Sequence, residues 1–223
     1  MQDNLDDIVN QSAASFMNIN VTKTKEMRLG VCARKQQHQD LILDGKVIEK
    51  VQSYKLLGVH VTEMLKWDVH ITAMLSKASK RIHFLKQLRR VCVSTADLVI
   101  YYNCVIRSVL EYACPVWHSS LTIGQSQEIE RLQKRALRCI LEDVSYADAC
   151  SLLGLPSLCD CREQMTRQFF EQLKRPNSCL AHLMPLKRDI SGYLRNARLY
   201  ELPKARTVRY AKSFLPYCIT HFT

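Results

Sequence analysis

Apolar residues recur with two different periods in this 223-residue chain, and the period changes near Asp68. Before this point apolar and polar positions roughly alternate, with the apolar ones at Val51, Leu56 or Leu57, Val59 and Val61. Alternation with β-branched residues is typical of a strand, and Gly58 within it indicates a bulge or a close approach of the backbone to another group. After Asp68 apolar residues recur every three or four positions, as on one face of a helix. The pattern therefore predicts short strands followed by a run of helices.

The first fifty residues contain one predicted helix and one predicted hairpin. Residues 1–18 place Ile8, Ala13 and Phe16 or Met17 at near-helical intervals. Residues 23–29 indicate the start of a strand. Residues 41–48 surround Asp44-Gly45, a pair that favours two-residue hairpin turns. This hairpin leads directly into the alternating segment of residues 51–61.

Three amphipathic helices are predicted after Asp68. The first has an apolar face spaced at four, three, four and three residues, formed by Ile71, Leu75, Ala78, Ile82 and Leu85. The second starts at the capping box Ser94-Thr95-Ala96-Asp97 and is ended by Pro115. Its core face is formed by Leu98, Tyr101 or Tyr102, Val105, Val109 and Tyr112. The third begins at Ser126 and directs inward Ile129, Leu132, Ala136 and Ile140.

Two more helices and a tail complete the chain. Ser145 caps a short helix over residues 146–153 that ends at Gly154, and Asp148 lies at its capping-box position. The next helix starts at residues 155–157, stops before Pro176, and buries Leu158, Cys161, Met165, Phe169 and Leu173. In the tail, arginines alternate with Tyr193, Tyr200, Tyr210, Phe214 and Tyr217. Base stacking and packing back onto the helices both account for this alternation.

These elements predict an α+β fold that is mostly α. A short hairpin and strand region precedes an antiparallel helical bundle. We expect three segments, at residues 1–62, 63–175 and 176–223. A chain of this length with 47% hydrophobic residues can bury a substantial core.

The net charge of +11, from 32 Lys+Arg against 21 Asp+Glu, favours an anionic partner. The tail carries 8 basic and 2 acidic residues. Between residues 77 and 90 there is no acidic residue to offset Lys77, Lys80, Arg81, Lys86, Arg89 and Arg90. A second basic stripe lies on the third helix, at Arg131, Lys134, Arg135 and Arg138. A charge run is often only a solvated face, but unrelieved like charges repel one another, so we predict nucleic-acid contact here.

The sequence gives little support to metal or membrane chemistry. Ten cysteines contain no C-x-x-C pair, so we expect small buried thiols in a reducing compartment, nuclear or cytoplasmic, and no zinc site. No apolar run approaches the ~20 residues of a membrane span. His38-Gln39-Asp40 matches the H-x-D half of a non-haem iron triad. The chain lacks the evenly spaced strands of a jelly roll, so we do not expect an Fe(II)/2-oxoglutarate dioxygenase.

Several segments, in order, carry a resemblance to a known family. They are residues 18–27, NINVTKTKEM; 53–59, SYKLLGV; 65–71, LKWDVHI; 110–118, LEYACPVWH; 129–138, IERLQKRALR; and 206–217. Together they resemble the C-terminal part of a non-LTR (LINE-type, jockey/CR1-like) retrotransposon reverse transcriptase, over residues 8–217. The matching part comprises the end of the palm, a primer-grip-like hairpin, the thumb and the tail.

The resemblance implies roles for particular residues. Tyr54, Lys55 and Gly58 would belong to the hairpin that positions the primer end. Lys23 and Lys25 would contact nucleotide or template phosphates, but without the palm beside them a solvated strand edge is the better explanation. The two basic helices would follow the backbone of a template–primer duplex. Arg162 stands where the family commonly has two adjacent arginines, and would contact a phosphate.

The same resemblance predicts binding without catalysis. In this family two Mg²⁺ ions are held by paired palm carboxylates, which would lie upstream of residue 1. Tyr146-Ala147-Asp148-Ala149 lacks the second Asp of a Tyr-Ala-Asp-Asp box. We therefore expect neither a cofactor nor a small-molecule substrate. Two alternatives stay open: an inactive expressed remnant whose palm hairpin exposes an edge, and a helical adaptor that binds an acidic protein.

Overall fold

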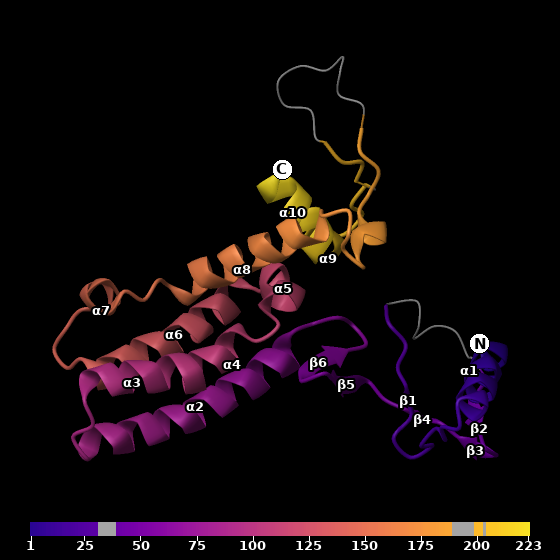
Figure 1. Ribbon diagram of the computed structural model, residues 1–223, viewed down its shortest axis with the longest axis horizontal. Coiled ribbons are helices and arrows are strands. Elements are labelled where there is room, and N and C mark those ends of the chain that lie inside the picture. Colours follow the sequence, from indigo (N-terminus) through magenta and orange to yellow (C-terminus); the bar gives the residue numbers. More distant parts are fainter. Residues whose placement is uncertain (31–38, 189–198, 203) are drawn as a thin grey trace. The chain divides into compact units, whose positions relative to one another are not determined.

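A computed structural model describes residues 1–30, 39–188, 199–202 and 204–223. The chain is α+β and mostly helical, as predicted (Figure 1). Its contacts divide it into two compact units, Met1–His70 and Ile71–Thr223, where the sequence indicated three segments. The tail does not separate from the helices because its own helix packs against them.

The N-terminal unit contains one helix and short strands. In chain order these are α1 (Gln2–Ala14), β1 (Lys25–Glu26), β2 (Ile42–Leu43), β3 (Lys46–Val47), β4 (Glu49–Lys50), β5 (Ser53–Leu56) and β6 (Val59–Thr62). They form three two-stranded sheets: β1 pairs with β4 in parallel, and β2–β3 and β5–β6 are antiparallel hairpins. Among the described residues of this unit, the buried apolar side chains are Leu43, Ile48 and Val59. The unit therefore has a small core.

Both hairpins turn on two residues with positive φ. Asp44 (φ 52°) and Gly45 (φ 69°) join β2 to β3, as the sequence predicts. Leu57 (φ 46°) and Gly58 (φ 87°) join β5 to β6 in the same way. Such turns match the right-handed twist of the strands they connect. Gly58 therefore lies in the turn of a hairpin, as the resemblance implied for Tyr54, Lys55 and Gly58, and not in a bulge, which was one of the two interpretations that the alternating pattern allowed.

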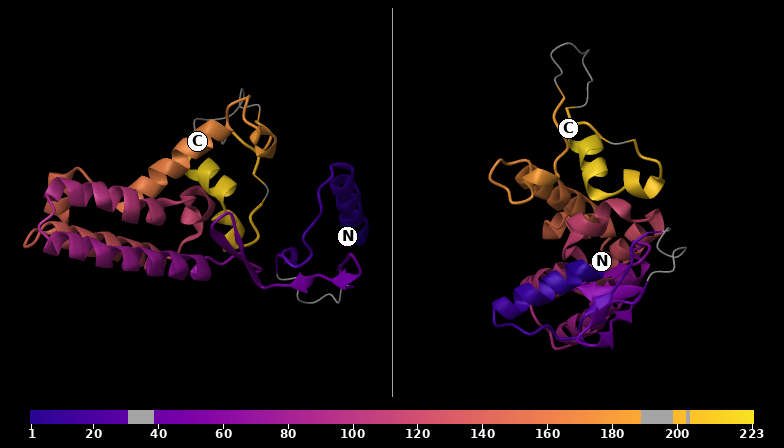
Figure 2. Two further views of the ribbon diagram at one scale, coloured as in Figure 1. Left: turned by 60° about the horizontal axis from the view of Figure 1, so that its bottom comes forward. Right: turned by 90° about the vertical axis from the view of Figure 1, so that its right-hand side faces the viewer.

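The C-terminal unit is helical. Its long helices are α2 (Asp68–Arg90), which starts just before the unit boundary, α6 (Ile123–Ile140) and α8 (Leu158–Leu173). The shorter elements are α3 (Thr95–Tyr101), η2 (Tyr102–Arg107), α4 (Ser108–Glu111), α5 (Cys114–Trp117), η3 (His118–Ser120), α7 (Tyr146–Leu153), η4 (Ala181–Leu183), α9 (Val208–Ala211) and α10 (Phe214–Phe222). Figures 1 and 2 show α2, α3 and α6 side by side, with α3 antiparallel to the other two.

The helix that contains α3, η2 and α4 has a different register from the predicted one. η2 is a π-helix, which has more residues per turn than an α-helix. The fully buried side chains consequently recur every four residues, at Leu98, Tyr102, Ile106 and Leu110. Val105 and Val109, predicted to face the core, are only partly buried, and Tyr112 is exposed.

Helix ends agree with the sequence where a side chain caps the backbone. The Oγ atoms of Ser94, Ser145 and Ser157 each accept a hydrogen bond from the backbone N–H three residues later. α6 starts before the predicted Ser126, because Thr122 and Gln125 form a capping box. Pro115 lies in the first turn of α5, so the preceding helix already ends at Glu111.

The C-terminal segment packs onto α8. Phe170, Tyr200, Cys218 and Ile219 are buried together, with Phe214 and Tyr217 partly buried against them. Packing back onto the helices thus accounts for these tail aromatics. Tyr210 stays exposed, and Tyr193 lies outside the described residues. On α8 itself Phe170 is buried in place of the predicted Phe169.

Candidate nucleic-acid interface

A basic groove lies between the C-terminal halves of α2 and α6, within the C-terminal unit. It is a pocket of about 430 Å³ lined by Lys86, Arg89, Arg90, Arg135, Arg138, Cys139 and Glu142. Five of these seven side chains are cationic, and all five belong to the two basic stripes predicted from sequence. We refer to this pocket as the α2–α6 groove.

The apolar faces of the two helices place these cations. Ile82 and Leu85 of α2, and Ala136 and Ile140 of α6, are buried in the bundle. Lys86 and Arg135 are adjacent in sequence to the buried Leu85 and Ala136, about a hundred degrees around each helix from them, so they lie at the edge of the apolar face. Because α2 and α6 run in the same direction (Figure 1), their C-terminal ends lie at the same end of the bundle, and residues of both line the pocket. The two basic edges consequently share one groove.

The charges of the groove are accessible to solvent. Lys86, Arg90, Arg135 and Arg138 are exposed, and Arg89 is partly buried. The nearest anion to Arg89 is Glu142, whose Oε1 lies 4.0 Å from Arg89 Nε. Burial raises the pKa of the Cys139 thiol above its ordinary value, although Lys86 and Arg89 oppose this shift. The thiol therefore stays neutral and does not offset the cations.

The remaining predicted residues of the two stripes lie outside the groove. Lys77, Lys80 and Arg131 are exposed elsewhere on α2 and α6. Lys134 is exposed, with its Nζ 5.0 Å from the centre of the Tyr146 ring. Arg81 donates from Nη1 to the carbonyl oxygen of Val105, so it ties α2 to η2. We assign Arg81 to the bundle and not to a ligand surface.

Arg162 is fully buried, so the predicted phosphate contact is not available to it in this structure. Its Nη2 donates to Ser126 Oγ at 3.1 Å, and its guanidinium lies 5.9 Å from the centre of the Trp117 ring. Nε and Nη1 are buried and have no hydrogen-bond partner in the described part of the chain. Burial lowers the pKa of Arg162 for this reason. The helical pattern did not indicate the burial of Arg162. It assigned the buried position to Cys161, the residue before it on α8, and both are buried.

The residues predicted from the primer-grip resemblance belong to the N-terminal unit. Lys23, Lys25 and Tyr54 line one small pocket of about 400 Å³. Lys25 Nζ is paired with Glu49 Oε2 at 2.5 Å, which offsets its charge, whereas Lys23 is exposed. Lys55 and Gly58 are exposed on the β5–β6 hairpin and do not line this pocket.

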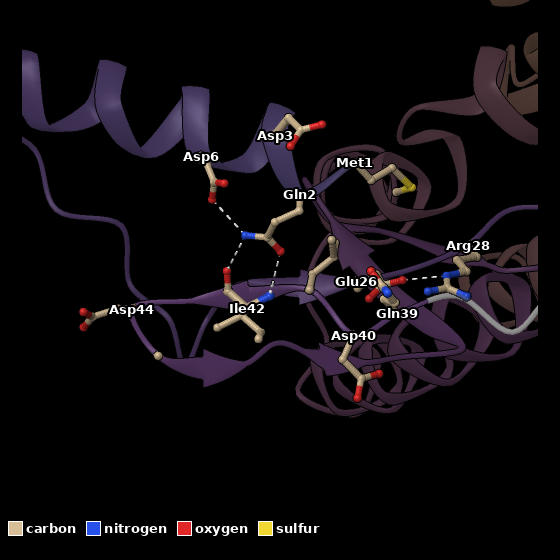
Figure 3. A pocket seen from close by; sticks show the side chains of 12 residues that line it. Met1, Gln2, Asp3, Asp6, Glu26, Arg28, Gln39, Asp40, Ile42 and Asp44 are labelled. Carbon is tan, nitrogen blue, oxygen red and sulfur yellow. Dashed lines mark hydrogen bonds and ion pairs between the residues drawn. The ribbon is translucent and has the colours of Figure 1, made fainter.

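A larger pocket of the N-terminal unit, of about 980 Å³, is acidic (Figure 3). Its lining includes Asp3, Asp6, Glu26, Asp40 and Asp44. The carboxylates of Glu26 and Asp40 are paired with Arg28 and Lys50, and the Lys50 pairing lowers the pKa of Asp40. The Gln2 side chain bonds to Asp6 and to the backbone of Ile42. This lining would repel a phosphate, so the pocket is not part of a nucleic-acid site.

The described residues contain no group of three or more His, Cys, Asp or Glu side chains that could hold a metal ion. His38 of the H-x-D sequence lies outside the described residues.

We compared the chain with protein families, curated proteins and solved structures. No family model, curated protein or solved structure matches it. Within the described part of the chain, no helix has the length and apolar character needed to cross a membrane.

Sequence reasoning missed two residues of the groove. Cys139 and Glu142 line it beside the predicted cations. The spacing of Cys139 gives a signal in retrospect, because it follows Arg135 by four residues and so lies on the same helical face. Glu142 lies beyond the end of α6, so helical spacing does not place it.

Proposed function

We propose that this chain binds the sugar–phosphate backbone of a nucleic-acid duplex through the α2–α6 groove, without catalysing polymerisation. The proposal follows the resemblance to the thumb of a LINE-type reverse transcriptase, in which the partner is a template–primer duplex. In that role the protein positions the duplex and does not read its bases.

One observation carries the proposal: five cations from two helices converge on one groove that has a single carboxylate. Cations held this close repel one another unless an anion lies among them. Phosphates of a nucleic-acid backbone supply anions in a row, and their contacts with Lys and Arg release condensed counter-ions. Both helices bury an apolar face in the bundle, so the backbone positions that carry the cations are held in place.

The test is fluorescence anisotropy of the whole chain with a short labelled RNA–DNA hybrid, titrated between about 50 and 200 mM salt. In the groove variant, Ala replaces Lys86, Arg90, Arg135 and Arg138. Each phosphate contact contributes about 0.9 log units of affinity per log unit of salt. We expect the wild-type chain to show a steep salt dependence, and the groove variant to bind more weakly with a shallower slope.

A matched control removes four exposed cations that lie outside the groove and outside the predicted sites, by changing Lys46, Lys66, Arg175 and Lys187 to Ala. It has the same net charge as the groove variant. Circular dichroism establishes that both variants are folded. Equal weakening in the two variants would contradict a localised site, and no binding by the folded wild-type chain at low salt would overturn the proposed function.

A further inference from the structure

We propose that Glu142 is the resident counter-ion of the α2–α6 groove, and that a polyanion must displace its carboxylate to reach Arg89. The nature of the natural polyanion rests on the proposed function, whereas the displacement itself rests on the groove alone. Removal of this carboxylate should therefore strengthen the binding of any phosphate-rich ligand.

The position of Glu142 is the first observation. Among the described residues that line the groove, it is the one with an acidic side chain. Its Oε1 lies 4.0 Å from Arg89 Nε, and 69% of its side chain is exposed. A carboxylate at this place occupies the space in which a phosphate would meet Arg89.

The second observation is that the position of Glu142, just after the C-terminal end of α6, disfavours an acidic side chain. α6 ends at Ile140, and Glu142 follows two residues later. The C-terminal end of a helix carries a partial negative charge, so a carboxylate there is disfavoured and a cation is favoured. The adjacent Asp143 adds a second negative charge at the same end. Attraction to the cations of the groove, from both α2 and α6, offsets this cost.

The pair between Arg89 and Glu142 is weak enough to be exchanged. A separation of 4.0 Å is too long for a hydrogen bond, and solvent screens both partly exposed side chains. A phosphate can offer Arg89 shorter, charge-assisted hydrogen bonds. In the wild-type chain the two anions compete, so Arg89 contacts the ligand in only a part of the complexes, namely those in which the Glu142 side chain has moved away into solvent.

The experiment compares wild-type protein with Glu142→Gln, a substitution of nearly the same shape and no charge. Two probes are used: the labelled RNA–DNA hybrid, and inorganic tripolyphosphate measured by calorimetry. We expect Glu142→Gln to bind both roughly threefold more tightly. The salt slope with the hybrid should become steeper by up to about 0.9, because Arg89 is free to contact a phosphate. Thermal stability should not rise, since the cations lose a counter-ion.

Glu128→Gln is the matched control. Glu128 is an exposed acid of α6 that does not line the groove, so its loss changes net charge alone. A gain from Glu142→Gln no larger than that from Glu128→Gln would overturn the inference. In an Arg89→Ala background the change in salt slope should disappear, and its persistence there would also count against the inference.

The two probes separate this inference from the proposed function. Failure of the wild-type chain to bind the hybrid, together with a gain toward tripolyphosphate in Glu142→Gln, would overturn the proposed function and support the role of Glu142. Hybrid binding that depends on the groove but is unaffected by Glu142→Gln would support the proposed function and overturn the role of Glu142.

Discussion

His118 lies in a cluster that holds the C-terminal helix α10 to α8. Its Nε2 lies 2.7 Å from Glu163 Oε2, and the Tyr217 hydroxyl donates to the same carboxylate at 2.7 and 2.9 Å. Tyr217 in turn stacks on His221, with ring centres 4.2 Å apart. Nδ1 of His118 is buried and has no hydrogen-bond partner among the described residues. The arrangement fits a neutral imidazole that donates from Nε2.

Burial lowers the pKa of His118 below its ordinary value near 6.5, despite the adjacent Glu163. The unfolded chain therefore takes up a proton at a pH where the folded chain does not. Stability is fully present above about pH 6.5 and declines as the pH falls below it. We predict that the urea midpoint is lower at about pH 5.5 than at about pH 7.5, and that His118→Gln reduces this difference.

The exposed His83 provides the control for the loss of one histidine, and the effect of His118→Gln should exceed that of His83→Gln. Part of the dependence should survive in His118→Gln, because burial also lowers the pKa of His70. Equal pH dependence in wild-type protein and His118→Gln would show that His118 is not responsible.

The π-helix η2 decides which side chains of its helix support the bundle. Ile106 is fully buried, whereas Val105 is only partly buried. We predict that Ile106→Ala lowers the free energy of unfolding by about 2–5 kcal/mol. Val105→Ala should lower it by less than about 1.5 kcal/mol, since the Val105 side chain buries less apolar surface to begin with. Urea unfolding of the two variants measures both values. A larger loss of unfolding free energy in Val105→Ala than in Ile106→Ala would contradict the register of the π-helix and support an uninterrupted α-helix.

Sequence patterns predicted the helices better than their registers. Serine caps at Ser94, Ser145 and Ser157 act through local hydrogen bonds, so the sequence alone is enough to locate them. The inward face of α6 was also predicted correctly, because that helix keeps one period throughout. The π-helix was not predicted because the apolar residues come in adjacent pairs, Val105-Ile106 and Val109-Leu110, so that either member of each pair can face the core.

The two units of the chain differ in how much apolar surface they bury. α1 buries no residue, and the described core of its unit is small. α6 buries six residues between its two ends. We predict that the amides of α1 exchange with solvent deuterium long before those of α6. Mass spectrometry of peptides from Gln2–Ala14 and Ile123–Ile140 in one sample makes the comparison, and equal protection of the two would contradict it.

The site could be predicted at the level of stripes but not of the groove. Each basic stripe follows from one helix and its period. Their meeting at Lys86, Arg89, Arg135 and Arg138 depends on α2 and α6 running the same way, which is a property of the tertiary fold. The phosphate contact of Arg162 was expected from the resemblance alone, and a resemblance in sequence does not reveal that this side chain is buried.

The π-helix also affects how this chain is compared with others. One extra residue within Tyr102–Arg107 moves every later side chain of the same helix, as far as Glu111, by about a hundred degrees. A relative with an uninterrupted α-helix here would need a one-residue gap in its alignment to this chain. An alignment without that gap would match Val105 and Val109 to core positions that Ile106 and Leu110 fill. Sequence similarity would then be underestimated where the bundle is most tightly packed.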